Sequence, residues 1–392
     1  DHFLQDHLNT EIATQVIESK QDAVDYLTWT FFYRRITQNP NYYNLQGVSS
    51  TIVSDHLSEL IEDTVKELEE SKCVLSDDLD LAPLNLGIIS AFYYVKASTI
   101  ALFNFSLTKT TKLKNLIHIL SNASEFEGIS IRHKEDEALQ KLASHLPLKI
   151  SKPDYNSTST KVNILLQCYF SRRTLPADLS ADQREILLVA PRLIQAMVDV
   201  ISSNGWLEPA LATMELSQMI TQAMWIYDPH LRQLPHITKE IVDRITEEAP
   251  DCKEVSDLLD LEDDHRAKLL SALDEQQMSD VAQAVNRFPA IEMTHQVQDP
   301  KNIKSGGTVT IAVSFSRELE EEEKLGPVYA PHYPAEKPEA WWCIVANRKT
   351  NLLHGIKRVV VTRPQLQETI EFDAPEAGHH ELVLYFVCDS YF

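Results

Sequence analysis

The spacing of apolar residues changes once along this chain, near residue 291. Before that point apolar residues recur every three or four positions, which is typical of helices with one buried face. After it, apolar residues alternate with polar ones, first at Val309, Ile311, Val313 and Phe315. Alternation with a period of two is typical of strands in an antiparallel sheet. The sequence therefore predicts a mainly helical chain that ends in an all-β sandwich.

Breaks in these patterns divide the chain further. A chain of 392 residues has room for roughly two to four domains. The expected divisions are a winged-helix module over 1–86, an all-helical bundle over 87–232, a domain of short helices over 233–290 and an antiparallel sandwich over 291–392. The predicted fold class is thus multidomain and mainly α, with one all-β domain.

The winged-helix module carries clear helix boundaries. Ser19 and Asp22 have the spacing of a capping box, and Pro40 ends the helix that follows. A second amphipathic helix is predicted over 54–73, followed by a polar turn at 76–80. The outer face of this second helix is acidic, which is the wrong sign for a helix that reads DNA. We therefore expect the module to face protein or solvent.

The net charge of the chain is −22, and it is unevenly distributed. Residues 1–86 hold 5 basic and 16 acidic side chains, while residues 87–232 hold 15 basic and 13 acidic ones. The two later segments carry net charges of −8 and −5. Because nucleic acids are bound through cationic surface, only the second segment could tolerate a polyanion. Contact with RNA is therefore expected to be weak or indirect.

The usual short signatures of enzymes and cofactor sites do not occur in this sequence. It has nine glycines and neither the P-loop nor the dinucleotide-binding glycine pattern, so we expect no ATP turnover by this chain alone. No short zinc, calcium or hydrolase motif is visible either, which makes an uncharacterised hydrolase the least favoured hypothesis. We expect no catalytic residue, no metal and no cofactor in this chain.

Cysteine usage and hydropathy indicate the compartment. Five cysteines are widely spaced without a C-x-x-C pair, as is usual for a protein kept in a reducing environment. The longest apolar run, 86–95, has ten residues, about half of the roughly 20 needed to span a bilayer. We therefore expect a nuclear or cytosolic protein without membrane contact.

One predicted helix of the bundle has an unusual pattern. From Pro191 onward it is apolar around most of its circumference, with a narrow polar stripe formed by Arg192, Gln195, Asp199 and Ser202. Such a stripe faces either outer solvent or an internal channel, and the pattern alone leaves both open. Proline has no amide hydrogen, so we expect the helix to start or kink at Pro191.

Two further features are candidate docking sites for partner proteins. An acidic run over 318–323, which contains Glu320 and Glu321, could bind a basic partner or form a solvated loop. The adjacent Trp341 and Trp342 could stack on a partner, although in a strand at least one of the two indoles is expected in the core.

Several strings of residues, spread over essentially the whole chain, carry a resemblance to a known family. They are 21–30, 33–35, 38–45, 55–60, 82–87, 192–196, 202–207, 223–225, 233–236 and 384–386. On these strings the chain resembles the second, C-terminal cassette of the two-cassette DExH-box RNA helicases of the spliceosome. The related helicase of the activating-signal cointegrator complex is the alternative within the family, and the strings 38–45 and 55–60 favour the spliceosomal one.

The resemblance implies a particular set of domains. The chain would contain a winged helix followed by a helical bundle, a helix-loop-helix domain over 233–290 and an immunoglobulin-like, fibronectin-III-like sandwich, a unit shared with a J-protein of the translocon. It would lack the RecA-like domains. The polar-striped helix would correspond to the family's ratchet helix, and Arg192, Gln195 and Asp199 would line an RNA channel. The family also continues beyond Phe392 into another strand.

The resemblance implies a function as well. In that family the second cassette is regarded as catalytically degenerate, and it serves as a docking platform and a regulator of the first. We therefore expect a non-catalytic protein-interaction and regulatory module of an ATP-dependent RNA helicase in pre-mRNA splicing. Its partners would be other spliceosomal proteins and the N-terminal helicase cassette of the same polypeptide, in the nucleus. The alternative is a module whose bundle contacts single-stranded RNA.

Overall fold

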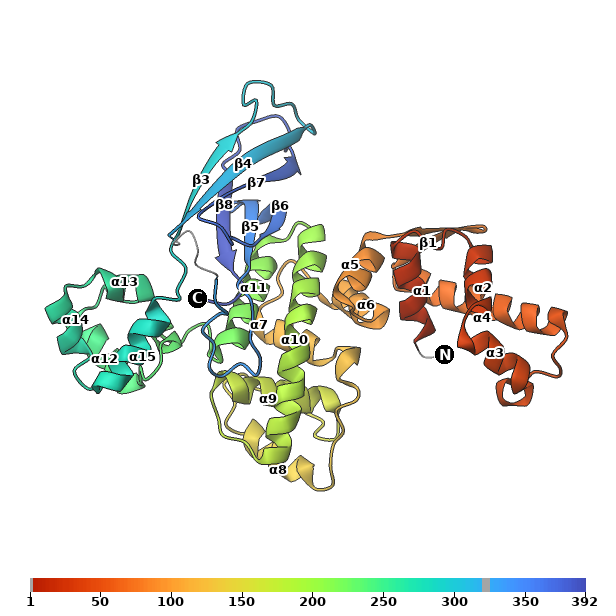
Figure 1. Ribbon diagram of the computed structural model, residues 1–392, viewed down its shortest axis with the longest axis horizontal. Coiled ribbons are helices and arrows are strands. Elements are labelled where there is room, and N and C mark those ends of the chain that lie inside the picture. The colour runs from red at the N-terminus through yellow and green to blue at the C-terminus, as the bar shows by residue number, and fades with distance from the viewer. Residues whose placement is uncertain (1–2, 319–324) are drawn as a thin grey trace.

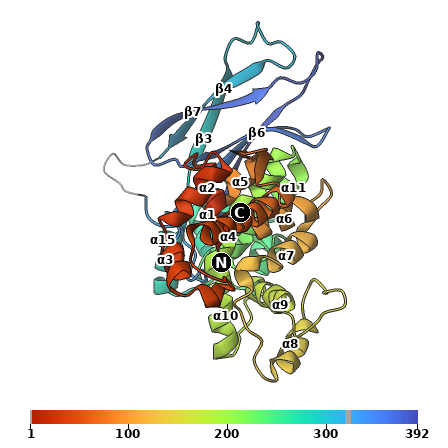
Figure 2. The same cartoon turned by 90° about the vertical axis from the view of Figure 1, so that its right-hand side faces the viewer.

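The computed structural model describes residues 3–318 and 325–392. Figure 1 shows a central helical bundle with three parts around it: the N-terminal helices on one side, a group of short helices on the opposite side, and two sheets at one end. In Figure 2, as in Figure 1, the sheets and helix α8 lie at opposite ends of the bundle. The mainly helical fold with antiparallel sheets is confirmed.

The N-terminal part contains four helices and a hairpin. Its elements are α1 (Leu4–Ala13), α2 (Lys20–Thr28), α3 (Phe31–Gln38), the short 3-10 helix η1 (Pro40–Tyr43), α4 (Ser50–Glu70), β1 (Val74–Asp77) and β2 (Asp80–Pro83). The hydroxyl of Ser19 accepts a hydrogen bond from the backbone of Asp22, as the capping pattern predicts. The single helix expected after Ser19 is instead two helices, because Thr30 is extended and its hydroxyl donates to the carbonyl of Leu27.

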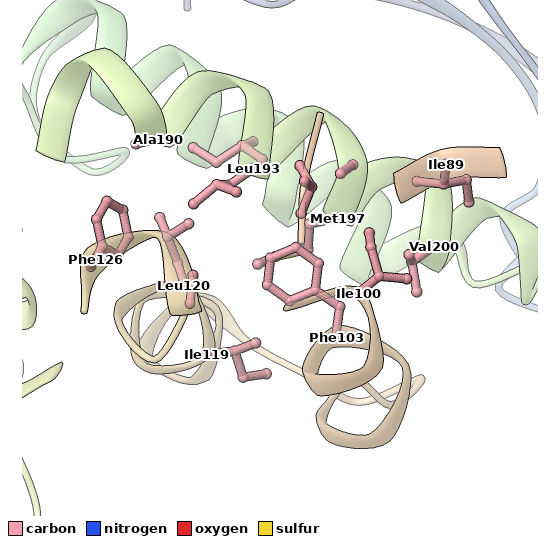
Figure 3. Packing of buried hydrophobic residues seen from close by; sticks show 14 of the residues in the cluster. Ile89, Ile100, Phe103, Ile119, Leu120, Phe126, Ala190, Leu193, Met197 and Val200 are labelled. Carbon is pink, nitrogen blue, oxygen red and sulfur yellow. The ribbon is translucent and has the colours of Figure 1, made fainter. Parts of the chain in front are cut away.

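The bundle contains seven α-helices. They are α5 (Asn85–Tyr93), α6 (Ala97–Ser106), α7 (Leu113–Ser121), α8 (Glu135–Ala143), α9 (Thr158–Phe170), α10 (Ala177–Ser203) and α11 (Leu207–Gln222), with a 3-10 turn, η2 (Ser124–Phe126), after α7. Figure 3 shows side chains from α5, α6, α7 and η2 packed against one side of α10. They include Ile89, Phe103, Leu120 and Phe126, which meet Leu193, Met197 and Val200. Helix α10 is therefore the centre of the core.

Helix α10 does not start at Pro191, contrary to the sequence prediction. It runs without interruption from Ala177 through Pro191 to Ser203. A proline leaves the carbonyl four residues earlier without its helical donor, and here that carbonyl belongs to the buried Leu187. The hydroxyl of Tyr333, from the segment before β5, donates to it at 3.2 Å. A distant side chain thus replaces the missing amide.

By length and apolarity α10 could cross a bilayer, but here it is the buried core helix of the bundle.

The group of short helices has a small core of its own. It contains η3 (His230–Gln233), α12 (Lys239–Glu248), α13 (Val255–Asp260), α14 (Asp263–Leu269) and α15 (Glu275–Val285). Ile241, Ile245 and Leu258 are among its buried residues.

Two three-stranded antiparallel sheets follow. One has the strand order β3-β4-β7 and the other β6-β5-β8. The strands are β3 (Ile291–Val297), β4 (Thr308–Arg317), β5 (Trp341–Asn347), β6 (Leu352–Val359), β7 (Gln365–Asp373) and β8 (Val383–Cys388). The alternating residues of β4, including Ile311 and Phe315, are buried with Val345 of β5, so both sheets contribute to one core. The predicted period-two strands are confirmed at β4 and β7.

The parts are joined to the bundle by shared core and by hydrogen bonds. Trp342 and Ile344 of β5 belong to the core that α10 organises. Gln222 of α11 donates to the carbonyl of Ser390, which follows β8, at 2.9 Å. On the N-terminal side, a Cβ at Gly87 would lie 2.2 Å from the carbonyl oxygen of Cys73, so only glycine allows α5 to approach so closely.

Candidate functional site

Two residues of the polar stripe of α10, Arg192 and Asp199, make hydrogen bonds to α5 or to the residue that follows it. Arg192 is exposed, while Gln195 and Asp199 are partly buried. Arg192 Nη1 donates to the backbone carbonyl of Tyr94 at 3.2 Å, and the amide of Asn85 donates to the hydroxyl of Ser203 at 2.7 Å. These contacts lie at the two ends of α5. Helix α10 is therefore hydrogen-bonded to both ends of α5, through Arg192 of the stripe and through Ser203 beside it.

Asp199 is the most constrained residue of the stripe. The hydroxyl of Tyr93, on α5, donates to Asp199 Oδ2 at 2.8 Å. Burial raises the pKa of Asp199, while this hydrogen bond and the charge of Arg358 on β6 oppose the rise. Burial and the nearby carboxylate also raise the pKa of Tyr93, which keeps its hydroxyl a donor. Asp199 is therefore occupied by contacts within the chain.

Arg192 closes the C-terminal end of α5. Tyr94, the residue that follows α5, has a left-handed backbone with a φ of 53°. A cation at this end of a helix satisfies a carbonyl and interacts favourably with the helix dipole. Because Arg192 is exposed apart from this contact, part of its guanidinium remains open to solvent. Among the three candidate channel residues, Arg192 is the one best placed to meet an external ligand.

Sequence reasoning missed Tyr93 and Arg358. Tyr93 is 106 residues from its partner Asp199, and no spacing rule connects them. Arg358 Nη2 pairs with Asp389 Oδ2 at 3.0 Å, and its guanidinium lies 4.3 Å from the ring centre of Trp342. Lys337 Nζ reaches the other oxygen of Asp389 at 3.0 Å. These charges connect β6 to the segments before β5 and after β8.

The two tryptophans have different environments. Trp342 is 1% exposed and belongs to the core, so its assignment as a partner-docking residue is wrong. The physical reason is strand alternation, which points neighbouring side chains to opposite faces of a sheet. Trp341 is partly buried, stacks on Phe386 with 4.3 Å between ring centres, and donates through Nε1 to Glu339. It also lines a cavity of about 570 Å³ to which β5, β8 and the short helices contribute, and Leu259 lines the same cavity.

The acidic run, the possible metal ligands and the cysteines complete the set of residues considered from the sequence. Glu320 and Glu321 lie outside the described residues. Within residues 3–318 and 325–392, no group of three His, Cys, Asp or Glu side chains is arranged to hold a metal. All five cysteines are buried as free thiols.

Comparison with protein families identifies both halves of this architecture. A winged helix-turn-helix domain model matches residues 1–78, and the Sec63 Brl domain model matches residues 83–392. The chain belongs to the Sec63 Brl domain family. Neither matched region is a helicase core domain. The Sec63 Brl region contains the bundle, the short helices and both sheets, and the boundary between the two matches falls at β2, since one match ends at residue 78 and the other begins at residue 83.

The relatives of this Sec63 Brl protein are large helicases. The chain is 51% identical over all 392 residues to the U5 small nuclear ribonucleoprotein 200 kDa helicase of Homo sapiens, and 49% identical to that of Drosophila melanogaster. It is also 49% identical to the activating signal cointegrator 1 complex subunit 3-like protein of Dictyostelium discoideum. In each case the chain spans 18% of the relative's length.

Proposed function

We propose that this chain is a non-catalytic protein-interaction and regulatory module of a spliceosomal RNA helicase that acts in pre-mRNA splicing. The similarity to U5 helicases over the whole chain supports this assignment. The matched families are a winged helix and a Sec63 Brl domain, which supports a role without nucleotide chemistry. The module would belong to the second cassette of such a helicase and would act in the nucleus. The chain is 51% identical to the U5 helicase and 49% identical to the cointegrator-complex protein. A module of the cointegrator-complex helicase is therefore the alternative within the family.

The single observation that carries the interaction role is that Asp199 and Arg192, in the polar stripe of α10, are hydrogen-bonded within the chain. A ratchet helix that grips RNA needs polar side chains free to meet phosphates or bases. Here the Asp199 carboxylate is held by Tyr93, and Arg192 is bridged to the end of α5. A buried carboxylate also repels phosphate. Both features favour protein partners over RNA.

We assign the four-part division of the chain, at 1–86, 87–232, 233–290 and 291–392, to the same proposal. The strand orders β3-β4-β7 and β6-β5-β8 support an immunoglobulin-like, fibronectin-III-like sandwich. If the six strands are labelled A to F in chain order, A, B and E form one sheet and C and F are paired in the other, as in immunoglobulin folds.

The proposed partners are other spliceosomal proteins and the N-terminal cassette of the same polypeptide. The cavity beside Trp341 is the docking site that we favour, because aromatic rings line it and Leu259 is 50% exposed at its wall. Aromatic residues in partly enclosed pockets are the side chains that dominate protein interfaces.

Capture of partners from nuclear extract tests this proposal. We expect the immobilised chain to retain spliceosomal proteins and the Leu259→Glu variant to retain less of at least one of them, since a carboxylate would enter an apolar contact. Leu75→Glu is the matched control, because Leu75 is 53% exposed on the distant hairpin. Equal capture by the parent and both variants would remove the cavity from the proposal. Deletion of the sheets is unsuitable because Trp342 and Ile344 complete the bundle core.

A second candidate function rests on the exposure of Arg192. Its guanidinium could still meet a phosphate, as in a channel that contacts single-stranded RNA. In that case Arg192→Glu would abolish RNA binding, whereas a module dedicated to protein partners would have no RNA binding to lose.

A further inference from the structure

A cationic hollow lies where the bundle, the short helices and the segment before β5 meet. Its volume is about 390 Å³, and its lining includes three positive side chains, Arg172, Arg232 and Lys239. His332 also lines it, and its lowered pKa leaves the imidazole neutral near pH 7. Apolar walls are supplied by Leu234 and by neighbouring residues. The chain as a whole carries a net charge of −22, so positive side chains gathered around one cavity are unusual here. Their combined positive potential favours the binding of an anion.

Arg172 is held in a fixed orientation at this hollow. Its Nε donates to the carbonyl of Ala223 at 2.9 Å, and its Nη2 donates to the carbonyls of Gln222 and Arg232 at 3.2 and 3.1 Å. Within the part of the chain that the structure describes, Nη1 makes no hydrogen bond. The N–H groups of Nη1 can therefore donate to a ligand. Because the guanidinium is already oriented, it loses little conformational entropy when an anion binds.

The cations of the hollow are close enough to repel one another. Burial, followed by the charge of Arg232, lowers the pKa of Arg172. Burial, followed by the charges of both arginines, lowers the pKa of His332. Asp228 offsets part of this charge, because its Oδ1 lies 3.3 Å from Arg232 Nη1. A bound anion would relieve the repulsion that remains.

A second hollow of about 440 Å³ adjoins the first, and the two share the lining residues Pro235, His236, Pro331 and His332. Arg287 lines the second hollow, as does Asp280, which is paired with His236 at 2.8 Å. Arginines therefore line both of these adjoining hollows. The combined size of the two hollows is in the range of small-molecule sites.

We infer that this double hollow binds a small, free anion that carries more than one phosphoryl group. Guanidinium groups match phosphate geometry through paired hydrogen bonds, and a ligand with more than one phosphoryl group can meet the arginines of both hollows at once. A nucleic-acid strand is disfavoured because the site is a pocket, not a long basic groove. This site is independent of the proposed protein docking beside Trp341.

Titration calorimetry with inorganic tripolyphosphate, at about 0.15 M salt, tests the inference. We expect one binding site per chain and an affinity that falls about tenfold in Arg232→Gln, since a charge-assisted hydrogen bond is lost. The backbone carbonyl of Arg232 still accepts from Arg172 in this variant, and the partly exposed ion pair with Asp228 is lost, so an unchanged circular dichroism spectrum is required of it. Arg363→Gln is the matched control, because Arg363 is exposed on the distant loop before β7.

A further variant and a further ligand test which feature of the anion is recognised. Arg172→Lys keeps the positive charge but removes the planar guanidinium, which can donate two parallel hydrogen bonds to one phosphoryl group. We therefore expect weaker tripolyphosphate binding with an unchanged circular dichroism spectrum. Inorganic phosphate should bind more weakly than tripolyphosphate, because it reaches only one group of cations. The inference is overturned if tripolyphosphate does not bind, if Arg363→Gln weakens it as much as Arg232→Gln, or if single-stranded RNA displaces it at lower concentration.

Discussion

At the level of single residues, the contact between Tyr333 and Leu187 explains how a proline fits inside the core helix. Leu187 is buried, so its carbonyl cannot turn to water if the Tyr333 hydroxyl is removed. We predict that Tyr333→Phe lowers the free energy of unfolding by about 1 to 3 kcal/mol, the usual cost of a buried group left without a partner. Urea denaturation measures the change, and Tyr94→Phe, at an exposed tyrosine, is the control.

The same contact makes a second, sharper prediction. Pro191→Ala restores an amide that can donate to the Leu187 carbonyl. We therefore expect Tyr333→Phe to cost less in the Pro191→Ala background than in the parent chain. A double-mutant cycle by urea denaturation gives this coupling. Additive effects of the two substitutions would show that the hydroxyl does not replace the missing amide.

Asp199 predicts a dependence of stability on pH. Its pKa is raised above the ordinary value of 3.8, so the folded chain holds this proton more tightly than the unfolded chain. Ionisation of Asp199 therefore lowers the free energy of unfolding as the pH rises through and above 3.8. Asn keeps an acceptor for Tyr93 and cannot ionise. We expect Asp199→Asn to be more stable than the parent at pH 7 and to lose this advantage at pH 3.

Thermal unfolding at a series of pH values measures this difference. Glu59→Gln, on the exposed face of α4, removes one negative charge without changing a buried contact and is the control. A parent chain that is more stable than Asp199→Asn at pH 7 would mean that Arg358 stabilises the carboxylate more than burial destabilises it.

At the level of elements, a buried ion network ties α8, α9 and α10 together. Lys161 of α9 is fully buried, and its Nζ lies 2.8 Å from Glu135 Oε2 on α8 and 2.7 Å from Asp182 Oδ2 on α10. Arg132 adds a hydrogen bond of 2.8 Å from its Nη2 to Asp182 Oδ1. The network fixes the relative positions of three helices at the end of the bundle far from the sheets (Figure 1).

Removal of the central cation should be costly. Lys161→Met leaves two carboxylates with Arg132 as their remaining partner, and breaking a buried pair costs about 3 to 5 kcal/mol. Urea denaturation should show a loss of this size, whereas Lys149→Met, at an exposed lysine, should show almost none. A loss below about 1 kcal/mol in Lys161→Met would indicate that the network contributes little to stability.

The same network predicts sensitivity to acid. Hydrogen bonds from Arg132 first, and from Lys161 next, lower the pKa of Asp182 below 3.8. A lowered carboxyl pKa adds stability above the ordinary value, and that stability is lost as the pH falls through the lowered one. The parent chain should therefore lose stability below about pH 3.8, and Lys161→Met should lose less over the same interval.

Local chemistry predicted some elements, and contacts between distant residues decided the others. The cap at Ser19, the stop before Pro40 and the strands with period two follow from neighbouring residues alone. The passage of α10 through Pro191 depends on Tyr333, which is 146 residues from its acceptor. The closure of the polar stripe likewise depends on Tyr93 meeting Asp199. No periodicity within one segment could predict either contact.

At the scale of the whole molecule, two features bear on function: the core that the bundle shares with its neighbouring parts, and the net charge of the chain. The bundle shares its core with the N-terminal helices and with β5, so the attached parts present their outer surfaces from fixed positions. Those surfaces belong to a chain of net charge −22, which suits partners that are not polyanions. Both features fit a module that holds other proteins within a larger helicase.

Fluorescence anisotropy of labelled single-stranded RNA, titrated with the full chain at about 0.15 M salt, is the decisive measurement. We predict no saturable binding below about 10 µM protein, because non-specific RNA contact requires an extended cationic surface and this chain carries a net charge of −22. Submicromolar binding with a steep dependence on salt, lost in Arg192→Glu, would contradict the proposed role and assign the stripe of α10 to an RNA channel.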